Sequence, residues 1–271
     1  MSLLVAENLS RSFGGVQAVQ DLSFSLRAGG VQAIIGPNGA GKTTLFNLVT
    51  GVLPPTSGRV LFHGQEITGL RPSRLARLGI SRTFQNLQLF GGMTALDNVL
   101  VGRHLHLERG LLGSLLRTPA LRRSERQARE QALELLAFVG LADQADTPAS
   151  GLPYGALKRL EVARALAAEP KLLLLDEPAA GCNETESAQL ERLLRGVARG
   201  GITVVLVEHD MRLVMSLAER ILVLDHGQRL AEGTPAQVRA DPAVIEAYLG
   251  HAYLEGEAAG GDDDDRSPAH G

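Results

Sequence analysis

Hydrophobic residues follow two patterns along this chain, and each pattern predicts a different kind of β-sheet. Short β-rich runs, separated by glycine or proline turns, occupy residues 3–6, 16–24 and 59–62. Continuous apolar runs occupy residues 31–35, 172–175, 203–207 and 221–224. Because strands buried on both faces read as continuous apolar runs, the second set predicts a parallel sheet, and the first set predicts an antiparallel sheet beside it.

Helical spacing marks segments between the apolar runs. Residues 124–139 carry apolar side chains three or four positions apart, opposite charged residues: Ala128, Ala132, Leu135, Leu136 and Val139. Together with a segment over about residues 96–116, this helix predicts a mainly helical insertion over residues 88–162. Strands that alternate with helices are typical of an α/β fold. We therefore expect an α/β core from residues 1–87 and 163–250, with an antiparallel β subdomain, interrupted by a helical subdomain.

The composition is that of a globular protein of a reducing compartment. The chain has 271 residues, of which 44% are hydrophobic, enough for one large core and a subdomain. Its apolar runs fall far short of the ~18 residues that a membrane-spanning helix needs, and we recognise no secretory signal at the N-terminus. A single cysteine, Cys182, excludes an internal disulfide. We therefore expect a cytoplasmic location and no segment that crosses a membrane.

The charge pattern argues against nucleic acid as a partner. The net charge is −3, and we interpret the basic stretches at residues 71–82 and 117–129 as solvated helix faces. We therefore expect no nucleic-acid partner. Residues 251–271 are rich in glycine and contain an aspartate run at 262–265, a composition that predicts a disordered acidic tail.

One segment carries a phosphate-binding pattern. Residues 36–43 fit the Walker A motif: Gly36, Pro37, Asn38, Gly39, Ala40, Gly41, Lys42 and Thr43. The motif lies between the predicted strand 31–35 and a predicted helix over residues 43–52, so backbone N–H groups and a helix N-terminus point at one place. The segment predicts a site for a nucleoside triphosphate, where Lys42 reaches the β- and γ-phosphates and the Thr43 hydroxyl holds Mg²⁺.

Two further segments complete the candidate chemistry. The apolar run 172–175 ends in Asp176 and Glu177, the Walker B arrangement. Because ligands of open α/β sheets lie at the carboxyl ends of the strands, Asp176 can bind Mg²⁺ directly or through water, and Glu177 can face the attacking water. Residues 152–156 precede a predicted helix over residues 157–168, which offers another helix N-terminus with a glycine for close approach.

Together these motifs resemble the ATP-binding cassette (ABC) family. The order Walker A, Gln85, residues 152–156, Walker B and His209 is the order of that family, and the resemblance covers residues 3–250. It implies a P-loop NTPase (RecA-like) core of the ABC ATPase type, with an antiparallel β subdomain and a helical subdomain. It also implies that the chain hydrolyses ATP, with Mg²⁺ as the cofactor.

The resemblance implies roles for single residues. The implied catalytic residues are Lys42, Gln85, Glu177 and His209, with Gln85 in the Q-loop and His209 as the switch histidine that contacts the γ-phosphate. The implied nucleotide contacts include the Walker A residues, Gln85 and His209, and beyond them Phe13, Val19, Thr44 and Asp176. The implied metal-binding residues are Thr43, Gln85 and Asp176. Phe13 would lie against adenine; the alternative is that it packs in the core of a sheet.

Two other segments imply a dimer. Leu152, Pro153, Tyr154, Gly155 and Ala156 match the signature motif, and Ala180, Gly181, Cys182 and Asn183 match the D-loop. In this family, ATP is bound between the Walker A motif of one cassette and the signature motif of the other. The usual signature is Leu-Ser-Gly-Gly-Gln and the usual D-loop has aspartate, so this chain departs from the family at Pro153, Tyr154, Ala156 and Asn183. We expect a heterodimer with a second ABC ATPase; a homodimer is the alternative.

Within the family, the chain is similar to the ATPases of bacterial branched-chain amino acid importers. The similarity is carried by residues 152–155, 177–181, 207–211, 233–235 and 247–250. It implies two integral membrane permeases, a periplasmic or extracellular solute-binding protein, and a peripheral position on the cytoplasmic face of the bacterial inner membrane. Uptake of small amides, an ATPase of lipopolysaccharide export and a soluble, non-transport ABC ATPase are the alternatives.

Overall fold

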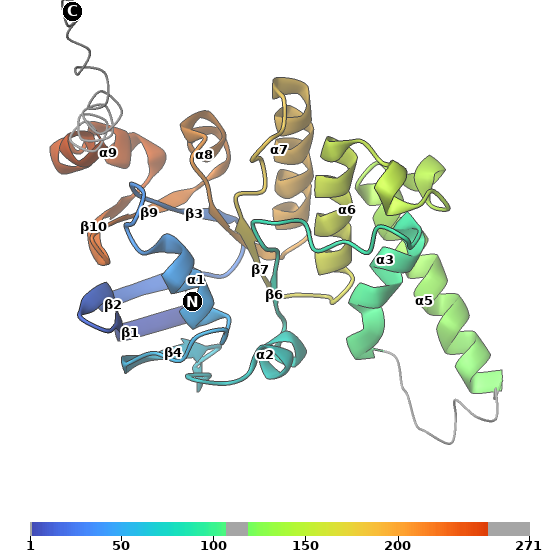
Figure 1. Cartoon of the computed structure of the whole chain (residues 1–271), viewed down its shortest axis with the longest axis horizontal. Helices are drawn as coiled ribbons and strands as arrows, with labels where there is room; N and C mark the ends of the chain where they lie inside the picture. The colour runs from blue at the N-terminus through green and yellow to red at the C-terminus, as the bar shows by residue number, and fades with distance from the viewer. Residues whose placement is uncertain (1, 107–118, 249–271) are drawn as a thin grey trace, which may run out of the picture.

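The computed structural model describes residues 2–106 and 119–248. Two β-sheets and the helices around them make up this part of the chain (Figure 1). The expected acidic tail, residues 251–271, lies outside the described residues, as does most of the second half of the helical segment that we expected over residues 96–116.

The larger sheet has six strands in the order β10-β9-β3-β8-β7-β6. Neighbouring strands are parallel, except that β10 runs antiparallel to β9. Its strands are β3 (Val31–Ile35), β6 (Ile80–Arg82), β7 (Leu172–Asp176), β8 (Thr203–Val207), β9 (Arg220–Asp225) and β10 (Gln228–Gly233). The four strands expected from apolar runs are therefore confirmed, whereas β6 and β10 were not expected.

The smaller sheet is antiparallel, in the order β2-β1-β4-β5. Its strands are β1 (Ser2–Phe13), β2 (Val16–Arg27), β4 (Ser57–Phe62) and β5 (Gln65–Glu66). The antiparallel sheet expected from the short β-rich runs is confirmed. Both β1 and β2 reach 12 residues, and each is longer than the run that predicted it because its polar positions lie on the exposed face.

Helices cover both sheets. They are α1 (Lys42–Val49), α2 (Pro72–Leu78), α3 (Ala95–Gly102), α5 (Pro119–Phe138), α6 (Tyr154–Leu166), α7 (Glu184–Arg199), α8 (Met211–Leu217) and α9 (Pro235–Ala240), with short 3₁₀ turns at η1 (Arg103–His106), η2 (Ala142–Gln144) and η3 (Ala149–Gly151). Figure 1 shows α3, α5 and α6 together at one end of the molecule, as expected for the helical insertion. The helix α6 runs without a break across residue 162, where we expected that insertion to end.

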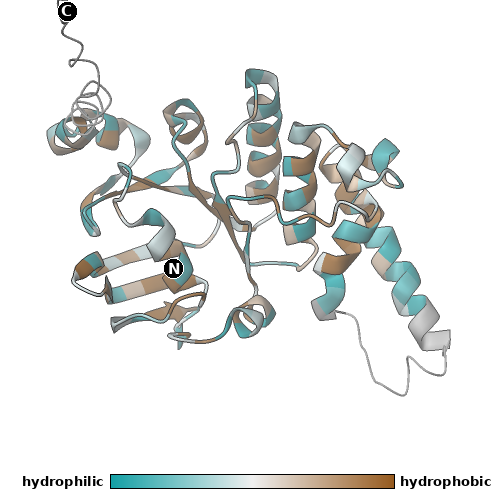
Figure 2. Ribbon diagram, in the orientation of Figure 1, coloured by the Kyte–Doolittle hydropathy of each residue, from teal (hydrophilic) through white to brown (hydrophobic). Residues whose placement is uncertain are grey.

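Successive residues of the larger sheet point into two different cores. On one side, Leu173 and Leu175 pack with residues of α6 and α7. On the other side, Leu172 and Leu174 pack with α1 and the smaller sheet. Figure 2 shows hydrophobic colours along the central strands and hydrophilic colours on the outer faces of the helices. The expected α/β fold, with a sheet buried on both faces, is confirmed.

Within residues 2–106 and 119–248, no helix combines the length and the apolar character that crossing a membrane requires.

Candidate active site

Residues 36–41 form the turn between β3 and α1. Close backbone contacts require two of its glycines: a Cβ on Gly36 would lie 2.2 Å from the carbonyl oxygen of Leu224, and one on Gly41, where φ is +97°, would lie 2.4 Å from that of Ala18. In this described segment, α1 has no side-chain cap and no acidic residue in its first turn. Its positive N-terminal end is therefore available to an anion.

Lys42 folds back over this turn. Its Nζ donates hydrogen bonds to the main-chain oxygens of Gly36, at 2.7 Å, and Pro37, at 2.8 Å. Burial lowers the pKa of Lys42, while the charges of Glu177 and Asp176 act in the opposite direction. The structure thus brings the Walker A lysine and both Walker B carboxylates into one electrostatic environment, as the sequence predicts.

Asp176, at the end of β7, is paired with a residue that the sequence analysis missed. Arg82 Nη2 donates to Asp176 Oδ2 at 2.8 Å, and the two side chains are only 7% and 4% exposed. The backbone N–H of Asp176 donates to Thr83 Oγ1 at 3.3 Å. Our interpretation of residues 71–82 as a solvated helix face is wrong for Arg82, because β6 carries this side chain into the sheet.

Glu177 lies between two other predicted catalytic residues. Its Oε1 is 3.0 Å from His209 Nε2, and its Oε2 accepts a hydrogen bond from Gln85 Nε2 at 3.1 Å. Glu177 has a φ of +49°, a left-handed conformation that is uncommon for residues other than glycine. Its N–H donates to the carbonyl of Val207 at 2.9 Å. Strain of this kind persists where the surroundings fix the backbone, and it is concentrated at functional sites.

Two buried charged residues that we did not single out support this arrangement. Glu208 accepts hydrogen bonds from the main-chain N–H groups of Ala179, at 2.7 Å, and His209, at 3.0 Å. Burial raises the pKa of Glu208, and these main-chain bonds oppose that shift. Lys158, a buried residue of α6, donates to the main-chain oxygen of Glu177 at 3.3 Å. Glu208 lies within residues 207–211, which carry the family similarity, but the sequence does not indicate its partners, and no motif marks Lys158.

The residues expected to contact the adenine base, and the threonines at the start of α1, differ in how exposed they are. Phe13 is 43% exposed at the end of β1, so the alternative that it packs in the sheet core is wrong. The guanidinium of Arg11 lies 4.7 Å from the centre of the Phe13 ring. Val19 is buried in the core, which leaves little of its side chain for contact with a base. Thr43 is exposed and Thr44 is half-buried.

The three residues predicted to bind the metal carry side-chain oxygens that suit Mg²⁺. The hydroxyl of Thr43, the carboxylate of Asp176 and the side-chain amide of Gln85 all offer the hard oxygen ligands that Mg²⁺ prefers. Across the described part of the chain, no three or more His, Cys, Asp or Glu side chains are grouped so that they could enclose an ion by themselves. A Mg²⁺ that arrives with a triphosphate needs only one or two side chains and completes its shell with phosphate oxygens and water.

The signature segment makes its contacts with the D-loop and α7 of the same chain. Tyr154 Oη donates to the main-chain oxygen of Ala180 at 3.0 Å. A Cβ on Gly181 would lie 3.0 Å from the Tyr154 ring. The N–H of Gly155 donates to Glu186 Oε1 at 3.2 Å. The first turn of α6 is therefore tied to the D-loop and to the first turn of α7.

The departures from the usual motifs have local structural roles. Asn183 is the N-cap of α7 and forms a capping box with Glu186, in which each side chain accepts a hydrogen bond from the other residue's N–H at 3.0 Å. Asparagine and aspartate are equally good N-caps, so Asn183 in place of aspartate does not weaken this helix. Pro153 occupies the N-cap position of α6, and Cys182 is half-buried.

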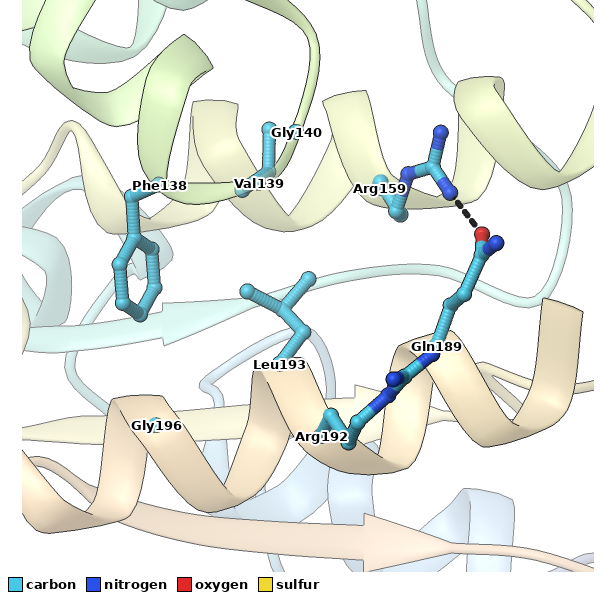
Figure 3. A pocket seen from close by; sticks show the side chains of 8 residues that line it. All are labelled: Phe138, Val139, Gly140, Arg159, Gln189, Arg192, Leu193 and Gly196. Carbon is cyan, nitrogen blue, oxygen red and sulfur yellow. Dashed lines mark hydrogen bonds between the residues drawn. The ribbon is translucent and has the colours of Figure 1, made fainter.

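A separate pocket lies among α5, α6 and α7 (Figure 3). It has a volume of about 450 Å³ and is lined by Phe138, Val139, Gly140, Arg159, Gln189, Arg192, Leu193 and Gly196. Arg159 donates a hydrogen bond to Gln189 within it. None of these lining residues belongs to the Walker, Q-loop or switch-histidine set, so the pocket is distinct from the predicted nucleotide site.

Comparison with known families fits this geometry. The family model described as ABC transporter matches residues 19–180. The chain belongs to the ABC transporter family. A second model, described as branched-chain amino acid ATP-binding cassette transporter, matches residues 228–253. The family resemblance and the ABC ATPase fold inferred from the order of the motifs are therefore confirmed, and the chain is an ATPase of this family.

Curated relatives match over nearly the whole chain. The high-affinity branched-chain amino acid transport ATP-binding protein BraF of Pseudomonas aeruginosa is 47% identical over 251 residues, which are 92% of this chain and 98% of the relative. The high-affinity branched-chain amino acid transport ATP-binding protein LivG of Escherichia coli is 44% identical over the same shares of the two chains.

Solved structures give the same result. The ADP conformation of MJ1267, an ATP-binding cassette of an ABC transporter, has a TM-score of 0.81 and 35% identity, covering 92% of this chain and 99% of that one. The dimeric structure of a post-hydrolysis state of the cassette MJ0796, bound to ADP and phosphate, has a TM-score of 0.71 and 26% identity, covering 86% of this chain and 98% of that one.

Proposed function

We propose that this chain is the ATP-hydrolysing subunit of an importer of branched-chain amino acids or closely related small amides. The two relatives described above carry branched-chain amino acid transport in their names and match 92% of the chain. The match of residues 228–253 to the branched-chain cassette model supports the same substrate class. The single observation that supports hydrolysis is the Glu177 carboxylate, held between Gln85 and His209.

The residues of this chain would divide the reaction among them. The open N-terminus of α1 binds the phosphates, and Lys42 exchanges its two carbonyl partners for phosphate oxygens. Thr43, Gln85 and Asp176 would hold Mg²⁺, which supplies neutralising charge when it is bound. Glu177 orients the attacking water and accepts its proton. His209, 3.0 Å from the Glu177 carboxylate, would hold that carboxylate and contact the γ-phosphate.

The assembly that we propose has several different subunits. A second, different ABC ATPase would supply an ordinary signature motif, because Pro153 and Tyr154 have replaced the serine and glycine of the usual motif here. The dimeric cassette described above supports pairing of two cassettes. Two integral membrane permeases and a periplasmic or extracellular solute-binding protein complete the importer. The chain would then be a peripheral protein on the cytoplasmic face of the bacterial inner membrane.

Uptake of radiolabelled leucine by living cells tests this function. Deleting the gene from its host should abolish high-affinity uptake of leucine, isoleucine and valine, and the unaltered gene should restore it. The Glu177→Gln variant should not restore uptake, whereas Glu184→Gln should, because Glu184 is 92% exposed on α7. Unchanged uptake in the deletion strain would contradict the substrate class.

A further inference from the structure

Arg82 connects three elements of the nucleotide site through one guanidinium group. Its Nη2 donates to Asp176 Oδ2, at 2.8 Å, on β7. Its Nη1 donates to Asn47 Oδ1, at 2.6 Å, on α1, the helix that follows Walker A. The same nitrogen donates to Thr50 Oγ1, at 3.1 Å, at the end of that helix. Arg82 itself belongs to β6, three residues before Gln85.

The surroundings of the guanidinium fix it in one plane. The ring of Phe46 lies 5.6 Å from its central carbon and the ring of Phe84 lies 4.9 Å from it. The Arg82 side chain is 7% exposed. Its Nε is buried and has no hydrogen-bond partner among the described residues, an arrangement that costs free energy. The three hydrogen bonds of its terminal nitrogens and the two aromatic rings hold the guanidinium in place.

The pair leaves Asp176 able to bind a metal. The hydrogen bond from Arg82 uses Oδ2, so the carboxylate can still offer Oδ1 to Mg²⁺ or to a water bound to it. A carboxylate that is held by an outer partner keeps one orientation, and removal of such partners typically lowers metal affinity.

We propose that Arg82 is a positioning residue for Asp176, which it holds in the orientation that binds Mg²⁺ by bridging α1, β6 and β7. This inference rests on the proposed function, because it takes Asp176 to be a residue that holds Mg²⁺. Lysine cannot replace Arg82 in this role, because an ammonium group lacks the planar fork that serves several partners at once. Arg82 also joins Asp176 to the strand that leads into the Q-loop, so the two metal-binding segments share one anchor.

Binding of a fluorescent ATP analogue to the purified full-length chain tests the inference. The dissociation constant is measured in EDTA and during a titration with Mg²⁺. The variants Arg82→Gln and Arg82→Lys should each raise the Mg²⁺ concentration for half-maximal binding about tenfold or more, with the dissociation constant in EDTA changing less than about twofold. The matched control Arg74→Gln, at an exposed position on α2, should behave like the unaltered chain.

A double-variant cycle separates positioning from a general structural role. If Arg82 acts through Asp176, then adding Arg82→Gln to Asp176→Asn should leave the Mg²⁺ titration of the single Asp176→Asn variant unchanged. A purely structural role would lower the melting temperature and the affinity in EDTA without moving the Mg²⁺ titration. An Arg82→Gln or Arg82→Lys protein that folds and keeps the original Mg²⁺ requirement, or binds Mg²⁺ more tightly, would overturn the inference.

The variant Asn47→Ala covers the case in which the Arg82 variants do not fold. It removes one partner of the guanidinium and leaves the pair with Asp176 in place, so the Mg²⁺ concentration should rise by a smaller factor, about two- to fivefold. An unchanged titration for Asn47→Ala would contradict the bridging role. If the unaltered chain bound no nucleotide under either condition, the proposed function itself would fail; if it bound nucleotide and the variants were silent, only the role of Arg82 would fail.

Discussion

The Walker A turn and the signature segment both place backbone N–H groups at the start of a helix, but those groups meet different partners. At α1, within the described residues, no side chain caps the helix and no acidic residue lies in its first turn. At α6, the N–H of Gly155 already donates to the Glu186 carboxylate. Tyr154, beside it, is bonded to the D-loop.

This difference separates the Walker residues, which one chain brings together, from the signature segment, whose donors are already in use within the chain. Lys42, Glu177 and His209 converge without any help from a second chain. In the signature segment, by contrast, the Tyr154 hydroxyl and the Gly155 N–H donate hydrogen bonds to carbonyl and carboxylate groups of the same chain. The γ-phosphate of an ATP bound to a partner cassette would have to displace the Glu186 carboxylate from the Gly155 N–H. A phosphate at α1 would displace only main-chain oxygens from Lys42.

Glu177→Gln should break the Walker side most strongly. The amide keeps the shape of the carboxylate but cannot accept the proton of the attacking water, so steady-state hydrolysis in the assembled complex should fall about a hundredfold to ten-thousandfold. ATP binding, measured by calorimetry, should remain. Glu184→Gln serves as the control on an exposed glutamate. Normal turnover by Glu177→Gln would rule out the role that we assign to this carboxylate.

The isolated chain should hydrolyse ATP slowly. Without a partner of ordinary signature, turnover should be about a hundredfold below that of the assembled pair, because the donors that stabilise the transition state from across the dimer are missing. A variant with Pro153→Ser, Tyr154→Gly and Ala156→Gln should raise the activity of the isolated chain, measured by phosphate release. Brisk, cooperative hydrolysis by the unaltered chain alone would contradict this contrast.

Tyr154→Phe should lower stability through the signature segment without changing nucleotide binding at the Walker site. It removes the hydrogen bond to the Ala180 carbonyl and keeps the ring against Gly181. The free energy of unfolding, measured with urea, should fall by about 0.5–1 kcal/mol. Nucleotide affinity at the chain's own Walker site should not change, since this residue contacts the D-loop. A large loss of that affinity would show that the two sides are not independent.

Asn183→Asp should have the smallest effect. Both residues cap a helix well, so the free energy of unfolding should change by less than about 0.5 kcal/mol, whereas Asn183→Ala should lower it by about 1 kcal/mol. Thermal unfolding followed by circular dichroism measures both. If Asn183→Asp altered hydrolysis by the assembled complex while stability stayed the same, Asn183 would have a role across the dimer beyond that of a cap.

The parts of the fold that were predictable are those with local patterns. The strand before Walker A and the strand before Walker B are continuous apolar runs, and each lies in the buried sheet. The helix α6 begins at Tyr154, three residues before the expected start, and Pro153 occupies the N-cap position without a side-chain cap.

The residues that escaped prediction act through distant partners. The strand β6 has only three residues, too few for a period to be visible, so Arg82 was read with the basic residues before it. Lys158 lies between Leu157 and Arg159 on a predicted helix, and nothing local indicates its hydrogen bond to the main chain of Glu177. By contrast, Asn183 and Glu186 have the spacing of a capping box, a signal that could have predicted both the start of α7 and the role of Asn183.

Because side chains alternate along β7, the sheet separates two hydrophobic compartments that are packed independently. Leu173 belongs to the compartment beneath α6 and α7, and Leu174 belongs to the one beneath α1. Two residues that are adjacent in the sequence therefore support the packing of two different parts of the molecule. A smaller side chain at Leu174 would leave a cavity in the core that supports the phosphate-binding turn. A smaller side chain at Leu173 would leave a cavity in the core that supports the helical end of the molecule.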